Sequence, residues 1–355
     1  MRSITGAGRR SIALAAGLLL VAFSAAPALA CGGLIGPNGA VNLLRTTTFA
    51  GYHDGVEHYV TSFEFAGGGG AFGSLTPLPG VPTDVVKGGD WTLQRLIRET
   101  NPELDARRSS AFEAASPAAS AEVLMEVTID ALDITVLKGG AQEVGQWATD
   151  HGFRLPPDAP EVLEFYAQRS QIFLAAAFDG EAAAARGQNV GDGTPVHITI
   201  PTDNPWVPLR ILALGKSESE IVQADVYLLT DQSPAMLPYP DGFNGMTVTH
   251  AAPANDLLLS DLRSDRGMEW VPDKAWLTKI AIDAKAPQLG YDLAVDVSGA
   301  NSPSRVAAGL DLPGAVDPTI YAALRGFATV SFIGVGVGAI ALLIARQLIG
   351  GFRPA

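Results

Sequence analysis

"LLRTTTFAGYHDGVEHYVTSFEFAG", residues 43–67, is the stretch that most directly predicts the fold of this chain. Two runs rich in Thr, Tyr, Val and Phe flank Asp54-Gly55, a dipeptide that favours the two-residue turn of a β-hairpin. With that turn, His53 and His58 project from one face as diagonal neighbours, and Glu57 points to the other face. We therefore expect a β-hairpin with histidines on one of its two faces.

Further elements follow the hairpin. Residues 90–100, "DWTLQRLIRET", predict a helix that Asp90 caps, with an apolar stripe formed by Trp91, Leu93, Leu96 and Ile97. Residues 141–153 predict a second helix, with Val144, Trp147 and Ala148 facing inward. Strand-like runs cover 123–137, 171–178, 194–202, 207–215 and 220–230. Because strands and helices do not alternate regularly, these runs predict an α+β fold, a β-rich mixed external domain with short helices.

The N-terminus has the pattern of a secretory signal. Arg2, Arg9 and Arg10 precede a short apolar run, and Ala28 and Ala30 occupy the small-residue positions before Cys31. A basic start, an apolar middle and a small-residue cleavage site are typical of a signal peptide. We therefore expect residues 1–30 to be a signal peptide, removed on export.

A second apolar segment lies near the C-terminus. Residues 327–345 contain no charged side chain and, as a helix, would extend about 28 Å, close to the thickness of a bilayer core. We expect a single-pass transmembrane helix here, with residues 346–355 in the cytoplasm and the N-terminal domain outside the cell membrane. Gly334 and Gly338 form a G-x-x-x-G spacing that allows two such helices to pair.

Between these ends we expect two external regions. Residues 31–230 form the main external domain, and residues 231–320, rich in Pro, Asp and Gly, form a looser region that leads to the membrane. The chain has a formal net charge of −13, and every acidic residue lies between the two apolar segments. An acidic surface repels nucleic acid, so we expect no nucleic-acid partner.

Cys31 is the only cysteine, so the external domain contains no internal disulfide. Three fates remain open for it. The sequence "ALAC" resembles a lipidation signal, although Ala28 stands where leucine is expected. Plain cleavage would leave a free thiol, and that thiol could pair with another chain.

Candidate functional residues are few. His53 and His58 are a weak metal-binding candidate, because a two-histidine site still needs a third ligand. Trp206, Trp270 and Trp276 stand among prolines and charges, where they either pack over the core or form a shallow sugar- or peptide-binding surface. No G-x-S-x-G, H-E-x-x-H or C-x-x-C motif occurs, and no cofactor is expected.

Several segments resemble a bacterial family known as domain of unknown function 2330. They are "CGG" directly after the signal, "SLTPLPGVPTDV", "WTLQRLI", "ALDITVLKGGAQEVGQWATDHGFRLP", "FLAAAF" and "PVHITIPTDNPWVPLRI". The resemblance covers about residues 31–230 and implies an exported envelope protein with no established activity. Relatives often carry a further cysteine just after this start. Here Ile35, Gly36 and Pro37 occupy that stretch, which puts any disulfide there in doubt.

Together these features predict a membrane-anchored cell-envelope protein whose external domain binds another envelope protein or a second copy of itself. The alternative is an envelope hydrolase with a triad or metal site that the sequence does not reveal. A pocket joining a histidine to a carboxylate and a nucleophile would favour the enzyme. An exposed groove without such groups would favour binding.

Overall fold

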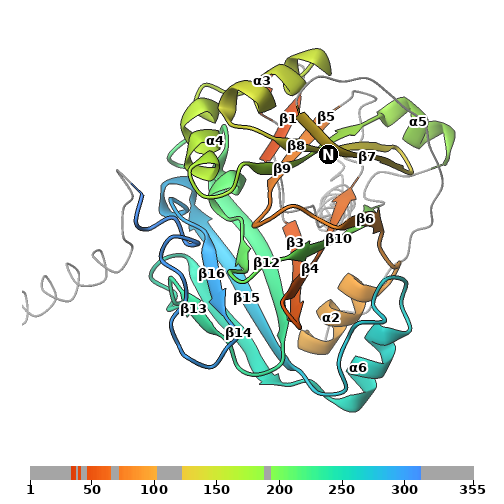
Figure 1. The fold of residues 1–355 in the computed structure, drawn as a ribbon, viewed down its shortest axis with the longest axis vertical. Helices are drawn as coiled ribbons and strands as arrows, with labels where there is room; N and C mark the ends of the chain where they lie inside the picture. Colours follow the sequence, from red (N-terminus) through yellow and green to blue (C-terminus); the bar gives the residue numbers. More distant parts are fainter. Residues whose placement is uncertain are drawn as a thin grey trace, which may run out of the picture.

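The computed structural model describes most of the region between the two terminal apolar segments. The described residues are 33–36, 39–40, 46–64, 72–101, 122–187 and 193–312. Strands dominate these ranges and form three sheets, called here sheet A with seven strands, sheet B with six and sheet C with three. Figure 1 shows sheet B at the top of the molecule and sheet A running through its centre.

The predicted hairpin is confirmed and forms the middle of sheet A. Strands β3 (Thr46–His53) and β4 (Val56–Glu64) pair through His53↔Val56, and the turn residues Asp54 and Gly55 have φ of 50° and 78°. Positive φ at both positions is what a type I′ turn requires. The sheet order is β14-β15-β12-β3-β4-β10-β6. Its other strands are β6 (Asp84–Lys87), β10 (Gly193–Pro201), β12 (Ile221–Thr230), β14 (Met246–Pro253) and β15 (Trp276–Lys285).

Sheet B has the order β2-β1-β5-β9-β8-β7. Its strands are β1 (Gly33–Gly36), β2 (Gly39–Ala40), β5 (Phe72–Pro77), β7 (Glu122–Ile129), β8 (Leu132–Lys138) and β9 (Ile172–Phe178). Helices α3 (Ala141–Asp150) and α4 (Ala159–Ala167) lie beside this sheet, and α5 (Gly180–Ala185) follows β9 (Figure 1). Val144, Trp147 and Ala148 of α3 are buried, as their spacing predicts.

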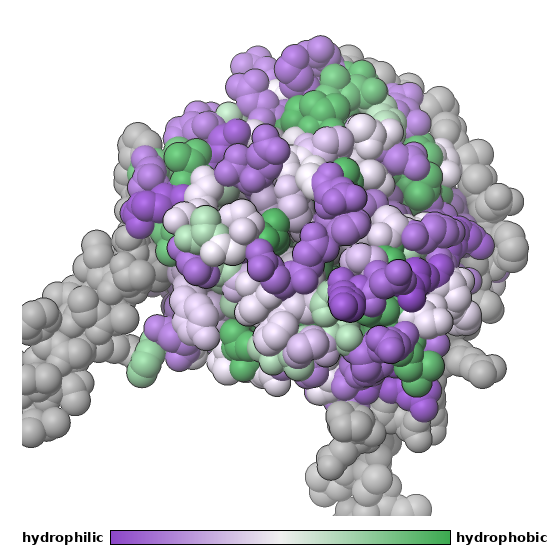
Figure 2. Space-filling model, turned by 60° about the horizontal axis from the view of Figure 1, so that its bottom comes forward, coloured by the Kyte–Doolittle hydropathy of each residue, from purple (hydrophilic) through white to green (hydrophobic). Residues whose placement is uncertain are grey.

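Two helices pack on the outer face of sheet A. Helices α2 (Thr92–Thr100) and α6 (Asp256–Arg263) contact each other and enclose a second hydrophobic cluster against that face. The cluster includes Phe49, Val60, Leu96, Tyr227, Leu258 and Leu262. Figure 2 turns the bottom of Figure 1, where α2 and α6 lie, toward the viewer. Hydrophilic residues cover most of that face, and hydrophobic ones form separate small patches.

Sheet C is held to the rest of the fold by a buried carboxylate. It consists of β11 (Trp206–Val207), β13 (Ala235–Leu237) and β16 (Leu293–Asp296). Asp292, which precedes β16, is fully buried. Its Oδ1 accepts hydrogen bonds from the Tyr166 hydroxyl at 2.9 Å and from the backbone N–H groups of Leu209 and Arg210 at 2.7 and 3.0 Å. Its Oδ2 accepts from Arg169 Nη2 at 2.5 Å.

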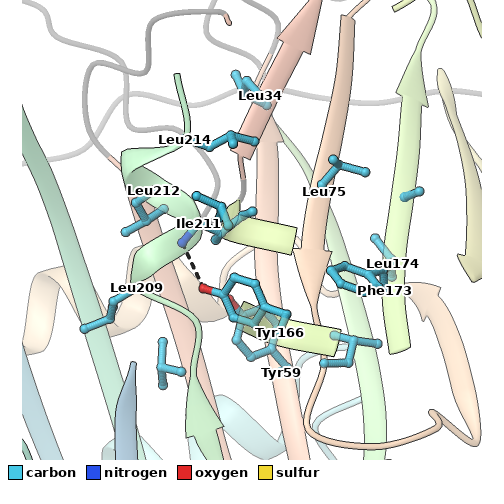
Figure 3. Packing of buried hydrophobic residues seen from close by; sticks show 14 of the residues in the cluster. Leu34, Tyr59, Leu75, Tyr166, Phe173, Leu174, Leu209, Ile211, Leu212 and Leu214 are labelled. Carbon is cyan, nitrogen blue, oxygen red and sulfur yellow. Dashed lines mark hydrogen bonds between the residues drawn. The ribbon is translucent and has the colours of Figure 1, made fainter. Parts of the chain in front are cut away.

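These bonds explain why one predicted strand is wrong. Residues 207–215 were predicted as a strand, but Arg210–Ala213 form a 3-10 helix, η1. The N–H groups of Leu209 and Arg210 bind Asp292, and that of Ile211 donates to the Tyr166 hydroxyl at 2.8 Å (Figure 3). Because these donors are occupied, they are not available to a strand ladder. A second 3-10 helix, η2 (Ala286–Gln288), follows β15.

The predicted fold class, α+β with a C-terminal transmembrane helix, is also wrong. The described part of the chain is β-rich, with three sheets and a few short helices, of which the longest has 10 residues. No helix among the described residues is long and apolar enough to cross a membrane. The predicted signal peptide (1–30), transmembrane segment (327–345) and tail (346–355) lie outside the described residues.

Residues on both sides of position 230, the predicted boundary between the two external regions, contribute to sheet A. Strand β12 ends at Thr230, and β15 pairs with it antiparallel along its whole length, from Ile221↔Lys285 to Thr230↔Trp276. Burial of the apolar residues of β15, including Leu277, Ile280 and Ile282, explains why this later segment joins the same core.

We predict that Asp292→Asn lowers the free energy of unfolding by about 3–5 kcal/mol, because it leaves the buried Arg169 guanidinium without a counter-charge. Urea denaturation of the purified chain would measure the change. Asp311→Asn is the matched control, since Asp311 pairs with Arg305 at a half-exposed position and its loss should change stability by less than about 1 kcal/mol. Equal effects of the two substitutions would contradict the prediction.

Candidate functional site

Two histidines meet on the outer face of sheet A. His58 lies on β4 and His197 on the neighbouring β10, where the register pairs His197 with Val60 and His58 with Thr199. The two rings therefore project from the same face. His58 Nδ1 lies 3.1 Å from His197 Nε2, and both side chains are buried.

Trp270 covers this pair. Its ring stacks on His58 with 3.9 Å between centroids and 4° between planes. Gly51 stands opposite His58 in the hairpin, and a Cβ there would lie 2.2 Å from the Trp270 ring. Gly267, with φ of 78°, lies close to His197: a Cβ on it would be 2.7 Å from His197 Nδ1. The absence of two side chains thus allows the segment after α6 to lie directly on the histidines.

Asp265 fixes the position of that segment. Its Oδ2 accepts hydrogen bonds from the backbone N–H of Trp91 at 3.1 Å and of Thr92 at 2.8 Å, and from the Thr92 hydroxyl at 2.7 Å. The carboxylate therefore satisfies the free N–H groups at the start of α2 and lies at the positive end of the helix dipole. The predicted cap, Asp90, does not serve this role. Trp91, predicted to be part of the apolar stripe of this helix, is 49% exposed.

Burial keeps both histidines neutral. Burial, together with smaller contributions from the neighbouring His197 and His53, lowers the pKa of His58 to about 3. Burial also lowers the pKa of His197, although Asp84 and Glu269 oppose the shift. Two neutral rings share one N–H···N hydrogen bond. Neither ring bonds to a carboxylate or hydroxyl among the described residues, so the pair lacks the nucleophile and orienting group of a triad.

The two histidines of the predicted metal site, His53 and His58, have different partners in the structure. His53 Nδ1 lies 2.7 Å from Asp231 Oδ1, whereas His58 meets His197. Within the described ranges, no group of three or more His, Cys, Asp or Glu side chains is placed to hold a metal ion. The sequence indicated that His53 and His58 share a face. It did not indicate His197, because that contact depends on the pairing of β4 with β10.

The three tryptophans do not form one surface. Trp206 is buried and stacks on Tyr166 at 5.8 Å, with the Arg169 guanidinium 4.7 Å from its ring. Trp270 covers His58, and Trp276 begins β15. The remaining sequence candidates, Cys31, Gly334 and Gly338, lie outside the described residues.

Glu57 lies on the opposite face of β4 from His58, as the hairpin register predicts. It is 1% exposed, and neither carboxyl oxygen has a hydrogen bond that meets normal geometry. Burial raises the pKa of Glu57 to about 8, while the nearby backbone N–H of Trp206 opposes the shift. The carboxyl group is therefore mainly protonated at neutral pH, because its charged form would be buried without a partner.

An exposed groove lies between α2 and α6. A cavity of about 520 Å³ is lined by Arg95, Arg98, Glu99, Leu257 and Asp261. Arg95 donates to Asp261 Oδ2 and to Glu99 Oε2, both at 2.7 Å. Arg98 has no ion pair with another described residue, and Leu257 is 67% exposed. Among the described residues, the groove therefore offers one cation without an ion pair beside one apolar side chain.

Comparisons with known proteins identify a family. Residues 25–288 match the family described as uncharacterized protein conserved in bacteria (DUF2330), which confirms the resemblance predicted from the sequence. No curated protein matches the chain. A crystal structure of a mutated baculovirus P35 after caspase cleavage has a TM-score of 0.37 and 9% identity, covering 71% of this chain and 99% of that one. A crystal structure of baculovirus P35 has a TM-score of 0.34 and 9% identity, covering 71% of this chain and 91% of that one. Similarity at this level supports no inference about activity.

We predict that the contribution of His58 to stability falls as the pH is lowered from 6.5 toward 3, because the unfolded chain protonates His58 before the folded chain does. His58→Gln removes this contribution and should reduce the loss between neutral pH and about pH 5 by about 1 kcal/mol, after allowance for solvent screening. Urea midpoints at both pH values would measure it. His250→Gln, on the edge strand β14, is the control, and an unchanged pH slope in His58→Gln would refute the assignment.

Glu57 should contribute a pH dependence of stability opposite in sign to that of His58. Its folded pKa of about 8 exceeds its ordinary value of 4.5, so stability is lost as the pH rises from 4.5 to 8. Glu57→Gln keeps the shape but has no charge to bury, and should stabilise the chain on the order of 3 kcal/mol at pH 7. Thermal unfolding at pH 4.5 and pH 8 would test this, with the exposed Glu126→Gln as control. A destabilised Glu57→Gln variant at pH 8 would contradict the prediction.

Proposed function

We propose a function for this chain from the premise that it belongs to the DUF2330 family of uncharacterized bacterial proteins. Its folded domain is exported and binds another protein of the bacterial cell envelope through the groove between α2 and α6. The signal-like pattern of residues 1–30 supports export. The groove supports a binding role.

The observation that carries this proposal is the combination of Leu257 and Arg98 in one open groove. An apolar side chain that is 67% exposed gains by being covered, and a guanidinium that has no ion pair with a described residue gains by meeting a carboxylate. The partner that fits is a polypeptide segment with an apolar side chain close to an acidic one.

The same groove gives little support to hydrolysis. Its lining residues include no Ser, Cys or His, and both of its carboxylates are bound by Arg95. The buried histidine pair lies under Trp270 and contacts no nucleophile among the described residues. A triad requires a nucleophile within hydrogen-bond reach of its base, so binding is the better supported of the two functions.

We predict that a photoreactive amino acid at position 257 crosslinks one discrete partner in intact cells. The same probe at Val306, which is 53% exposed but lies outside the groove, serves as the matched control. Arg98→Glu should reduce the yield at position 257 by about tenfold, because it replaces an attractive charge contact with a repulsive one. Mass spectrometry of the adduct would identify the partner.

Two results would overturn the proposal. One is the same adduct pattern from positions 257 and 306. The other is a yield at position 257 that Arg98→Glu leaves unchanged while the variant keeps the wild-type unfolding temperature.

A further inference from the structure

A second surface feature lies at the opposite end of β14 from α6. Residues 238–246, "PYPDGFNGM", run from the end of β13 to the first residue of β14, and we call them the aromatic loop. Tyr239 is 62% exposed and Phe243 is 67% exposed. The groove between α2 and α6 includes none of these residues, so the loop is independent of the function proposed above.

Hydrogen bonds within the loop hold its shape. Asn244 donates from Nδ2 to the carbonyl of Tyr239 at 3.0 Å and accepts from the Met246 N–H at 3.1 Å. Gly242 N–H donates to the Met246 carbonyl at 2.7 Å, and Phe243 N–H donates to Asp241 Oδ1 at 2.9 Å. The buried Pro238 and Pro240 flank Tyr239 on both sides. These contacts and the fixed φ of proline limit the backbone conformations open to the loop.

The loop is also fixed to the body of the protein. The N–H of Asp283 on β15 donates to the Gly245 carbonyl at 2.8 Å, and Gln288 Nε2 of η2 donates to the Phe243 carbonyl at 3.4 Å. The aromatic rings are therefore held in solvent by an ordered frame. A surface ordered before binding loses less conformational entropy when it binds, and aromatic side chains are enriched in protein interfaces.

The negative charge of Asp241, close in sequence to Tyr239 and Phe243, favours a positively charged partner. Asp241 lies between Tyr239 and Phe243 in the chain, is exposed, and forms no ion pair with a described residue. The whole chain has a net charge of −13, which favours a cationic partner over an anionic one. Aromatic faces attract Lys and Arg side chains, most strongly when the cation is partly removed from water.

We propose that the aromatic loop binds a lysine- or arginine-bearing segment of a partner polypeptide. The cation lies against the rings of Tyr239 and Phe243 and pairs with the carboxylate of Asp241. A neutral sugar stacked on the same rings would not need Asp241, so substitution of that residue separates the two kinds of ligand.

The test uses fluorescence anisotropy of a labelled Gly-Ser peptide bearing several lysines, added to the purified full chain. A peptide of equal length with glutamine in place of lysine is the matched probe. We expect the lysine peptide alone to bind, with affinity that falls as salt is added. Phe243→Ala and Asp241→Asn should each weaken it about fivefold, since cation–π and exposed ion-pair contacts contribute about 1 kcal/mol each.

Leu257→Ala lies in the groove between α2 and α6 and should leave peptide affinity unchanged, which separates this test from that of the groove. Equal binding of the two peptides would overturn the proposal. The proposal would also be overturned if neither Phe243→Ala nor Asp241→Asn changed the affinity for the lysine peptide. A third contrary result would be a neutral oligosaccharide that competes with the peptide equally well before and after Asp241→Asn.

Discussion

The buried carboxylate of Asp292 is the interaction on which the arrangement of this fold depends. A charge with no access to water is tolerated only when donors satisfy it, and here Tyr166, Arg169 and two backbone N–H groups do so. These donors come from α4, the segment after it and η1, whereas Asp292 itself leads into sheet C. The Asp292 side chain thus fixes the position of sheet C relative to the helices that lie beside sheet B.

Strand β4 shows how burial controls charge in this protein. Glu57 and His58 are adjacent in sequence but face opposite sides of sheet A, toward two different hydrophobic clusters. Both lose their charged form, the acid by a raised pKa and the base by a lowered one. Neither of these two side chains therefore brings a charge into the core at neutral pH. The ionised groups that remain for recognition are those on the surface, including Arg98 and Asp241.

Local patterns predicted the parts of the fold that local interactions determine. Asp54-Gly55 predicted the hairpin, because the turn needs positive φ at two consecutive residues. The apolar spacing in α3 predicted its buried side. The cap of α2 could not be predicted in the same way, because Asp265 is 173 residues from Thr92. His197 is 139 residues from His58, and neither periodicity nor spacing indicates a contact over that distance.

The two surface features place a directional constraint on a partner. Strand β14 begins where the aromatic loop ends, and α6 begins shortly after β14 ends. Its eight residues span about 27 Å, so a ligand that touches both features must be an extended chain or a protein surface. The groove presents the Arg98 guanidinium and the loop presents the Asp241 carboxylate, and neither forms an ion pair with a described residue. A single partner would therefore need an acidic group at one end and a basic group at the other, and the reversed orientation would bring like charges together at both ends.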